Sequence, residues 1–125
     1  MATVLLVEDD ESTGTLLVEL LSDLGFAPEH HDNASGAIAA AHHRPFDLVV
    51  TDLWLGGDHE GAWENVARLR EATPDVPLLV LTGHASALEQ GRLSGYDVLL
   101  KPFDVEEFEH TIRAMLRPSG ESAGG

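Results

Sequence analysis

The sequence predicts an α/β fold in which five parallel strands form one sheet and five helices cover both of its faces. Short apolar runs of strand length alternate with segments whose apolar residues recur at helical spacing. The apolar runs contain few polar residues, which is typical of parallel strands that are buried on both faces. The intervening segments are long enough to hold right-handed helical crossovers, so consecutive strands can run parallel.

Five segments have the length and composition of strands: residues 3–7, 26–31, 47–51, 77–81 and 97–100. The second of them is the weakest, because it contains Pro28 and two histidines. Proline cannot donate a hydrogen bond to a neighbouring strand, so Pro28 suits an edge position better than a central one. We therefore expect residues 26–31 at an edge of the sheet.

The first two helices are indicated by apolar stripes and by residues that start or stop a helix. The first is expected to end near Gly25. Its stripe is a set of leucines: Leu16, Leu17, Leu20, Leu21 and Leu24. The second begins at Asn33, a good N-cap residue, and is closed by Pro45. Its stripe consists of Ala34, Ala37, Ile38 and Ala41.

The three later helices have signals of different strength. A glycine-rich loop precedes the third, which carries Trp63, Val66, Ala67 and Leu69. Trp63 lies among these apolar residues, so we interpret it as part of the core and not of a binding site. Residues 85–93 have little apolar pattern and predict a short, weak helix. Asp104 is expected to cap the last helix, with an inward stripe of Val105, Phe108, Ile112, Met115 and Leu116.

The composition limits the classes of function. The 125 residues suffice for one domain core, which we assign to residues 1–117, with residues 118–125 as a flexible tail. The chain has 22 acidic and 7 basic residues, and a net charge of −15 disfavours binding to nucleic acid or to anionic membranes. The absence of cysteine excludes disulfides and thiolate metal sites. Because no signal peptide or membrane-length apolar run is found, we expect a cytoplasmic location.

Polar residues follow four of the predicted strands. Glu8 and Asp9 follow the first, Asp52 the third, Thr82 the fourth and Lys101 the fifth. The carboxyl ends of parallel strands share one edge of a sheet, where α/β proteins bind ligands, so these residues are expected to converge. Three converging carboxylates repel one another unless a cation is bound. Oxygen ligands favour a hard divalent ion, either Mg²⁺ or Mn²⁺.

Four segments at these strand ends resemble the receiver family of two-component response regulators, over roughly residues 3–117. They are VLLVEDD at residues 4–10, DLVVTD at 47–52, LTG at 81–83 and KPF at 101–103. One such segment is weak evidence, whereas four in the right order at strand ends are specific. The resemblance implies the flavodoxin-like strand order 2-1-3-4-5.

The resemblance also implies a metal site. Asp9 corresponds to the direct ligand of Mg²⁺, and Glu8 acts mainly through water. Asp52 and the backbone carbonyl of Trp54, two residues further on, complete the ligands that the protein supplies. Mn²⁺ can take the place of Mg²⁺.

For the chemistry, the resemblance implies that Asp52 accepts a phosphoryl group from a histidine kinase or a phosphotransfer protein. Thr82 would donate a hydrogen bond to one phosphoryl oxygen, and Lys101 would neutralise another. The bond between Lys101 and Pro102 is usually cis in this family. Such a chain is a signalling module and not an enzyme with a separate substrate, because it catalyses only its own phosphorylation and dephosphorylation. Its state is passed to a downstream protein or to an output domain.

The chain departs from the family pattern at two places that concern signal output. The loop after Asp52 has Gly56 where receivers usually have proline, and its closing glycine, Gly61, comes one residue late. Receivers usually carry Tyr or Phe three residues before the lysine, but this chain has Val98. Tyr96 is expected on the same face of the strand as Val98, one step further from the site.

Several alternatives remain open at the level of sequence. A degenerate receiver would bind partners without being phosphorylated. A flavin or nucleotide enzyme on the same fold would need a phosphate-binding loop after the first strand, where this chain has acidic residues. The chain could be a free-standing receiver or the receiver part of a longer regulator or hybrid kinase.

Two sets of residues have a structural interpretation beside the functional one. Asp10 could cap the first helix or support the site. The adjacent pairs His30-His31 and His42-His43 point different ways and do not readily share a metal ion, so we expect solvated surface histidines.

Overall fold

A computed structural model describes residues 2–53 and 62–116 of the chain. The strands are β1 (Thr3–Val7), β2 (Ala27–His31), β3 (Leu48–Asp52), β4 (Leu78–Thr82) and β5 (Asp97–Leu100). The helices are α1 (Glu11–Asp23), α2 (Ala34–His43), α3 (Ala62–Ala72), α4 (Ala85–Leu93) and α5 (Val105–Met115). The strands pair in parallel in the order β2-β1-β3-β4-β5, which confirms the predicted fold class and strand order.

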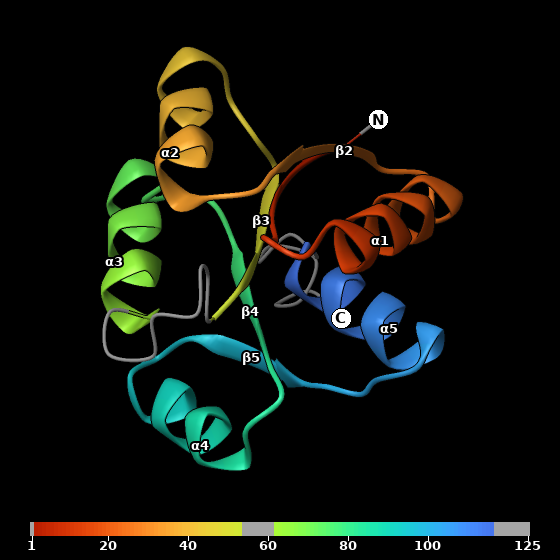
Figure 1. Cartoon of the computed structure of the whole chain (residues 1–125), viewed down its shortest axis with the longest axis vertical. Coiled ribbons are helices and arrows are strands. Elements are labelled where there is room, and N and C mark those ends of the chain that lie inside the picture. The colour runs from red at the N-terminus through yellow and green to blue at the C-terminus, as the bar shows by residue number, and fades with distance from the viewer. Residues whose placement is uncertain (1, 54–61, 117–125) are drawn as a thin grey trace, which may run out of the picture.

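The helices cover the two faces of the sheet unequally (Figure 1). α1 and α5 lie on one face, and α2, α3 and α4 lie on the other. Alternate residues of a strand point to opposite faces, so each strand contributes to two cores. Leu6 packs with Phe108 in the α1–α5 core, and Val7 packs with Val66 in the other.

The strand predictions agree with the structure to within one residue at each end. β2 lies at the edge of the sheet, where Pro28 is opposite Val4 of β1, as the proline predicted. The residues of β2 are half-buried, whereas β3 and β4 are buried almost throughout. The difference in burial explains why the sequence signal for β2 was weak.

Side-chain caps fix the starts of three helices. The carboxylate of Asp10 accepts a hydrogen bond from the Thr13 N–H at 2.8 Å, so Asp10 is the N-cap of α1. Asn33 caps α2 by accepting from the Gly36 N–H at 2.7 Å. Asp104 forms a reciprocal capping box with Glu107 at the start of α5. These bonds satisfy backbone donors that have no partner within the helix.

Two apolar residues that were expected to point inward are exposed, and those predictions were wrong. Leu16 of α1 is 64% exposed and Val105 of α5 is 53% exposed. The buried stripe of α1 is narrower than its apolar pattern: Leu17 and Leu21 are buried, and Leu20 and Leu24 are half-buried against the core. Smaller deviations occur at Ala67, which is exposed. In α2 the fully packed third alanine is Ala40, while Ile38 and Ala41 are half-buried.

Trp63 is half-buried and packs against the core, as predicted, at the junction of α3, α4 and β5. Its ring stacks on that of Tyr96 with centroids 5.7 Å apart. Gly91 of α4 faces the same junction. A Cβ atom on Gly91 would lie 2.5 Å from Val98 and 2.6 Å from the Trp63 ring. α4 can therefore approach β5 and α3 this closely because residue 91 has no side chain.

The predicted glycine-rich loop and the tail at residues 118–125 lie outside the described residues. Within the part of the chain that the structure describes, no helix is long and apolar enough to span a membrane.

We predict that Gly91→Ala destabilises the domain by about 1–2 kcal/mol, since the overpacking cost exceeds the gain in helix propensity. Urea unfolding monitored by circular dichroism measures this change. Gly83→Ala is the matched control, because a Cβ atom there meets nothing within 4 Å and should leave stability nearly unchanged. Equal stability of the two variants would contradict the close packing at Gly91.

Candidate functional site

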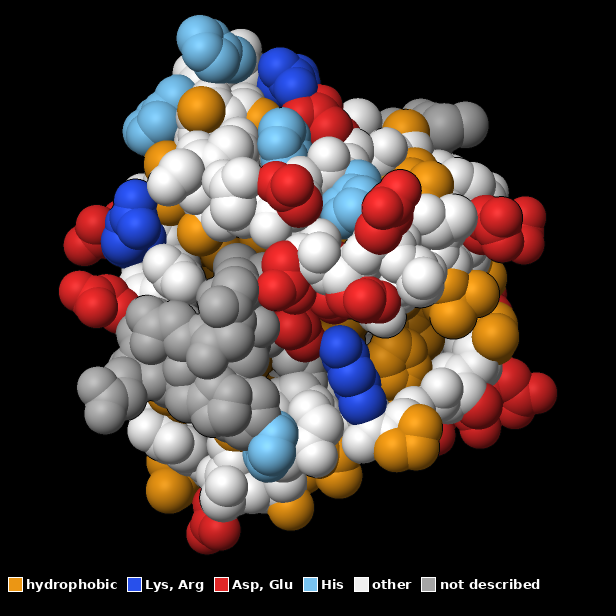
Figure 2. All heavy atoms as spheres, in the orientation of Figure 1, with side chains coloured by type: hydrophobic (Ala, Val, Ile, Leu, Met, Phe, Trp, Pro, Cys, Tyr) orange, Lys and Arg blue, Asp and Glu red, His pale blue; other side chains and the backbone are white. Residues whose placement is uncertain are grey.

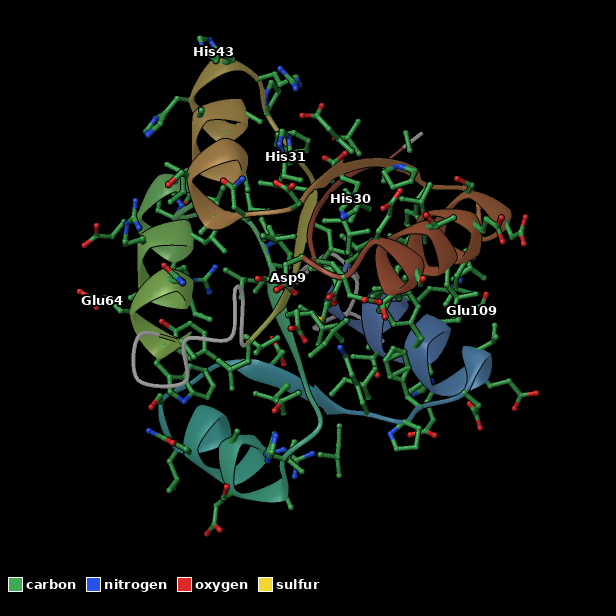
Figure 3. All side chains as sticks on the ribbon, in the orientation of Figure 1. Asp9, His30, His31, His43, Glu64 and Glu109 are labelled. Carbon is green, nitrogen blue, oxygen red and sulfur yellow. The ribbon has the colours of Figure 1, made fainter. Side chains whose placement is uncertain are left out.

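Four strand ends bring the predicted site residues to one edge of the sheet. Glu8 and Asp9 follow β1, Asp52 ends β3, Thr82 ends β4 and Lys101 follows β5. The parallel register places these ends side by side, since Val7 pairs with Thr51 and Thr82 pairs with Leu100. Figure 3 shows Asp9 at the centre of this edge.

Three carboxylates converge at this edge. Glu8, Asp9 and Asp52 each offer one oxygen atom, and these atoms lie within 4.8 Å of one another. In Figure 2 acidic side chains gather at the centre of this face, with a basic side chain against them. Glu8 is only 2% exposed, and Asp52 has a 15% exposed side chain that ligands can reach from solvent.

Lys101 supplies positive charge to this acidic cluster. Its ammonium group donates a hydrogen bond to Oδ1 of Asp52 at 2.8 Å and lies 3.6 Å from Oε2 of Glu8. Burial alone would lower the pKa of Lys101, but the hydrogen bond to Asp52 and the negative charges of Asp52 and Glu8 outweigh it and raise that pKa. The bond to Pro102 is cis, as the resemblance implied. The backbone N–H of Lys101 donates to the Thr82 carbonyl at 2.7 Å, which anchors the residue to β4.

Glu8 has one satisfied and one unsatisfied carboxylate oxygen. Oε1 accepts a hydrogen bond from the Asp10 N–H at 3.1 Å. Oε2 is buried and has no hydrogen-bond partner among the described residues. Burial raises the pKa of Glu8, and the nearby charge of Asp52 raises it further. A buried carboxylate oxygen with no donor is costly, and a bound cation would remove that cost.

The hydroxyl group of Thr82 lies buried at the end of β4. Its oxygen accepts a hydrogen bond from the His84 N–H at 3.2 Å. A hydroxyl has one hydrogen to donate, so Thr82 can still donate to an acceptor in the site. All predicted site side chains thus lie at one sheet edge, whereas Trp54, whose carbonyl was a predicted ligand, lies outside the described residues.

The two adjacent pairs of histidines differ in burial. His42 and His43 are exposed, as expected. His30 and His31 are half-buried and hydrogen-bonded, so the expectation of solvated side chains was wrong for this pair. Nε2 of His31 contacts Oε2 of Glu29 at 2.7 Å, and Nε2 of His30 lies 2.8 Å from the carbonyl oxygen of Glu8.

Sequence reasoning missed His30 as a neighbour of the site. A signal was present in Gly14, a glycine inside a helical pattern, which often marks a close approach of another group. In the structure the His30 ring occupies the space that a side chain at Gly14 would fill.

Known proteins share both the sequence pattern and this fold. The family described as the response regulator receiver domain matches residues 4–113. The transcriptional regulatory protein PcoR of Escherichia coli is 29% identical over an alignment of 126 residues, which covers 98% of this chain and 55% of PcoR. The probable transcriptional regulatory protein SilR of Salmonella typhimurium is 34% identical over 117 residues, 91% of this chain and 50% of SilR.

Among solved structures, the chemotaxis protein CheY4 of Vibrio cholerae matches with a TM-score of 0.78 and 27% identity, covering 93% of this chain and 99% of CheY4. The chain thus spans about half the length of PcoR and SilR and nearly all of CheY4. The family match includes every strand end that contributes to the site. The chain therefore belongs to the receiver domain family of two-component response regulators.

Proposed function

We propose that this receiver accepts a phosphoryl group on Asp52 from a histidine kinase or a histidine phosphotransfer protein. The observation that carries the proposal is the hydrogen bond between Lys101 and Asp52 beside two further carboxylates. In the reaction a carboxylate oxygen of Asp52 attacks phosphorus. The bond between phosphorus and the donor's imidazole nitrogen breaks, and the imidazole leaves.

The residues at the site fit a divalent cation. Three carboxylates with oxygens within 4.8 Å of one another, and a buried Glu8 oxygen with no hydrogen-bond donor in residues 2–53 and 62–116, form the all-oxygen set that Mg²⁺ prefers. Mn²⁺ would also be accepted. We assign Asp9, Glu8 and Asp52 to this ion, and the carbonyl of Trp54 remains a predicted ligand. When bound, the ion neutralises charge that develops on the phosphoryl oxygens.

Lys101 and Thr82 would stabilise the same negative charge on the phosphoryl oxygens. The ammonium group of Lys101 already contacts Asp52, so it can move to a phosphoryl oxygen with little rearrangement. The hydroxyl of Thr82 can donate to a second oxygen. Phosphoryl transfer depends mostly on positioning and charge stabilisation, which these two groups provide. A degenerate receiver would have no use for this full set of residues, which counts against that alternative.

An apolar groove beside Lys101 offers a surface to the phosphodonor. The groove, of about 480 Å³, lies between α1 and the start of α5 and is lined by Leu16, Leu20 and Phe103. Glu19, Asp23 and Asp104 also line it, so a donor helix with apolar and basic side chains would complement it. Figure 2 shows apolar surface directly beside the basic side chain of the site. A donor seated there would hold its phosphohistidine near Asp52.

We expect the signal to pass to a downstream protein or to an output domain. PcoR and SilR are about twice as long as this chain, which leaves room for such a domain in those proteins. We do not assign nucleic-acid binding to this chain, because its net charge is −15. The cytoplasmic location remains a prediction.

With acetyl phosphate and Mg²⁺, the chain should gain the mass of one phosphoryl group, and Asp52→Asn should gain none. Lys101→Met should slow phosphorylation about a hundredfold, because it removes one group that stabilises the developing charge. Intact-protein mass spectrometry over time measures both effects. An unmodified chain at saturating donor would instead support the degenerate receiver.

Glu8→Gln should stabilise the Mg²⁺-free domain at neutral pH and weaken Mg²⁺ binding. Burial raises the pKa of Glu8 in the folded domain above its value in the unfolded chain. Below about pH 4.5 Glu8 is protonated in both states and causes no loss of stability. As the pH rises through the folded pKa, ionisation of the buried side chain lowers the free energy of unfolding. The gain in melting temperature from Glu8→Gln should therefore be larger at pH 7.5 than at pH 4.5. Thermal unfolding in EDTA measures it, and an equal gain at both pH values would contradict the raised pKa.

A further inference from the structure

The side chain of His30 joins the edge strand to the acidic cluster. His30 lies on β2 opposite Leu6 of β1. Its Nε2 atom is 2.8 Å from the backbone carbonyl oxygen of Glu8. A carbonyl oxygen only accepts hydrogen bonds, so Nε2 carries the hydrogen and donates it. In Figure 3 His30 lies between β2 and the start of α1, and it lines the same surface pocket as Asp9.

This carbonyl belongs to the peptide that links the two metal-site residues Glu8 and Asp9. The preceding peptide is also fixed, since the Glu8 N–H donates to the His31 carbonyl at 3.0 Å. β2 thus holds both peptide groups of Glu8. Rotation of the Glu8–Asp9 peptide would redirect the Asp9 side chain, so the bond from His30 limits where that carboxylate can lie.

Gly14 of α1 makes room for this arrangement. A Cβ atom at Gly14 would lie 2.3 Å from Cε1 and 2.6 Å from Nε2 of His30. No real Cβ atom approaches another atom so closely, so any side chain at position 14 would displace the ring. Gly14 is buried, and α1 accepts a residue of low helix propensity at this position.

We propose that His30 is a positioning residue of the metal site, which orients the Glu8–Asp9 peptide through its Nε2–H group and depends on Gly14 for its place. The inference deepens the proposed function and rests on it. It does not require His30 to change its protonation state. Groups that orient metal ligands typically change metal affinity by about 10- to 100-fold when they are removed.

Two substitutions separate the hydrogen bond from the packing of the ring. His30→Phe keeps an aromatic ring of similar size but has no donor, and it should raise the Mg²⁺ dissociation constant about tenfold. His30→Gln places an amide N–H at a similar reach and should restore most of the affinity. Calorimetric titration with Mg²⁺ measures both, and amide shifts of Asp9 on Mg²⁺ addition report the ligand directly.

His31→Phe is the matched control, because His31 is the next residue on β2 and its side chain bonds Glu29 instead of the Glu8 carbonyl. Its Mg²⁺ affinity should equal that of the unaltered chain. Thermal unfolding without Mg²⁺ verifies that each variant is folded. If His30→Phe lowers only the melting temperature and leaves the Mg²⁺ affinity unchanged, the inference is overturned. If the unaltered chain binds no Mg²⁺, the proposed function fails first and this inference fails with it.

A double-mutant cycle tests the role of Gly14 independently. Gly14→Ala should weaken Mg²⁺ binding in the unaltered chain, because the new methyl group displaces the His30 ring. The same change in a His30→Ala background should have no further effect on Mg²⁺ affinity, since no ring remains to be displaced. Equal losses in the two backgrounds would show that Gly14 acts without His30 and would contradict the proposed dependence.

Discussion

The mutual repulsion of Glu8, Asp9 and Asp52 is the constraint that organises the carboxyl edge of this sheet. Parallel pairing brings their oxygens within 4.8 Å, and Lys101 offsets part of the negative charge from the end of β5. Burial raises the pKa of Glu8, and the negative charge of Asp52 adds to that effect. Burial alone would lower the pKa of Lys101, but the hydrogen bond to Asp52 and the charges of Asp52 and Glu8 outweigh it, so that pKa is raised too. The free domain therefore retains excess negative charge, which favours binding of a cation.

The sequence predicted the strands and the convergence of the candidate site residues because both depend on a simple rule. A strand buried on both faces must be apolar along its length, and a residue at its carboxyl end lies at the site edge whatever the helices do. The helix faces were predicted less well, as Leu16 and Val105 show, because the apolar stripe of a helix does not indicate how much of it the neighbours will cover. His30 was missed for a different reason. Its contact depends on the β1–β2 register and on the space above Gly14, and both arise from tertiary packing.

The aromatic residues of this receiver are displaced from the position that the family usually uses. Val98 occupies that position and is buried. A Cβ atom on Gly91 would meet both Val98 and the Trp63 ring, which stacks on Tyr96. The aromatic rings near this position thus belong to Trp63 of α3 and to Tyr96, the residue before β5. The β4–β5 pairing joins this group to the site edge, since Thr82 lies opposite Leu100 and Val80 opposite Val98.

Backbone hydrogen bonds hold the ends of β1 and β5, where the negative charge is concentrated. A carboxylate that is free to rotate would turn away from its neighbours and so lower the repulsion. Binding of a cation would then cost the entropy of ordering that side chain and the energy of bringing the carboxylates together again. The carboxylate of Glu8 is held by the Asp10 N–H, and the backbone of Glu8 is held by His31 and His30. Lys101 is tied to Thr82 through its backbone. The edge strand β2, in which every residue is half-buried, thereby contributes directly to the order of the highly charged site edge.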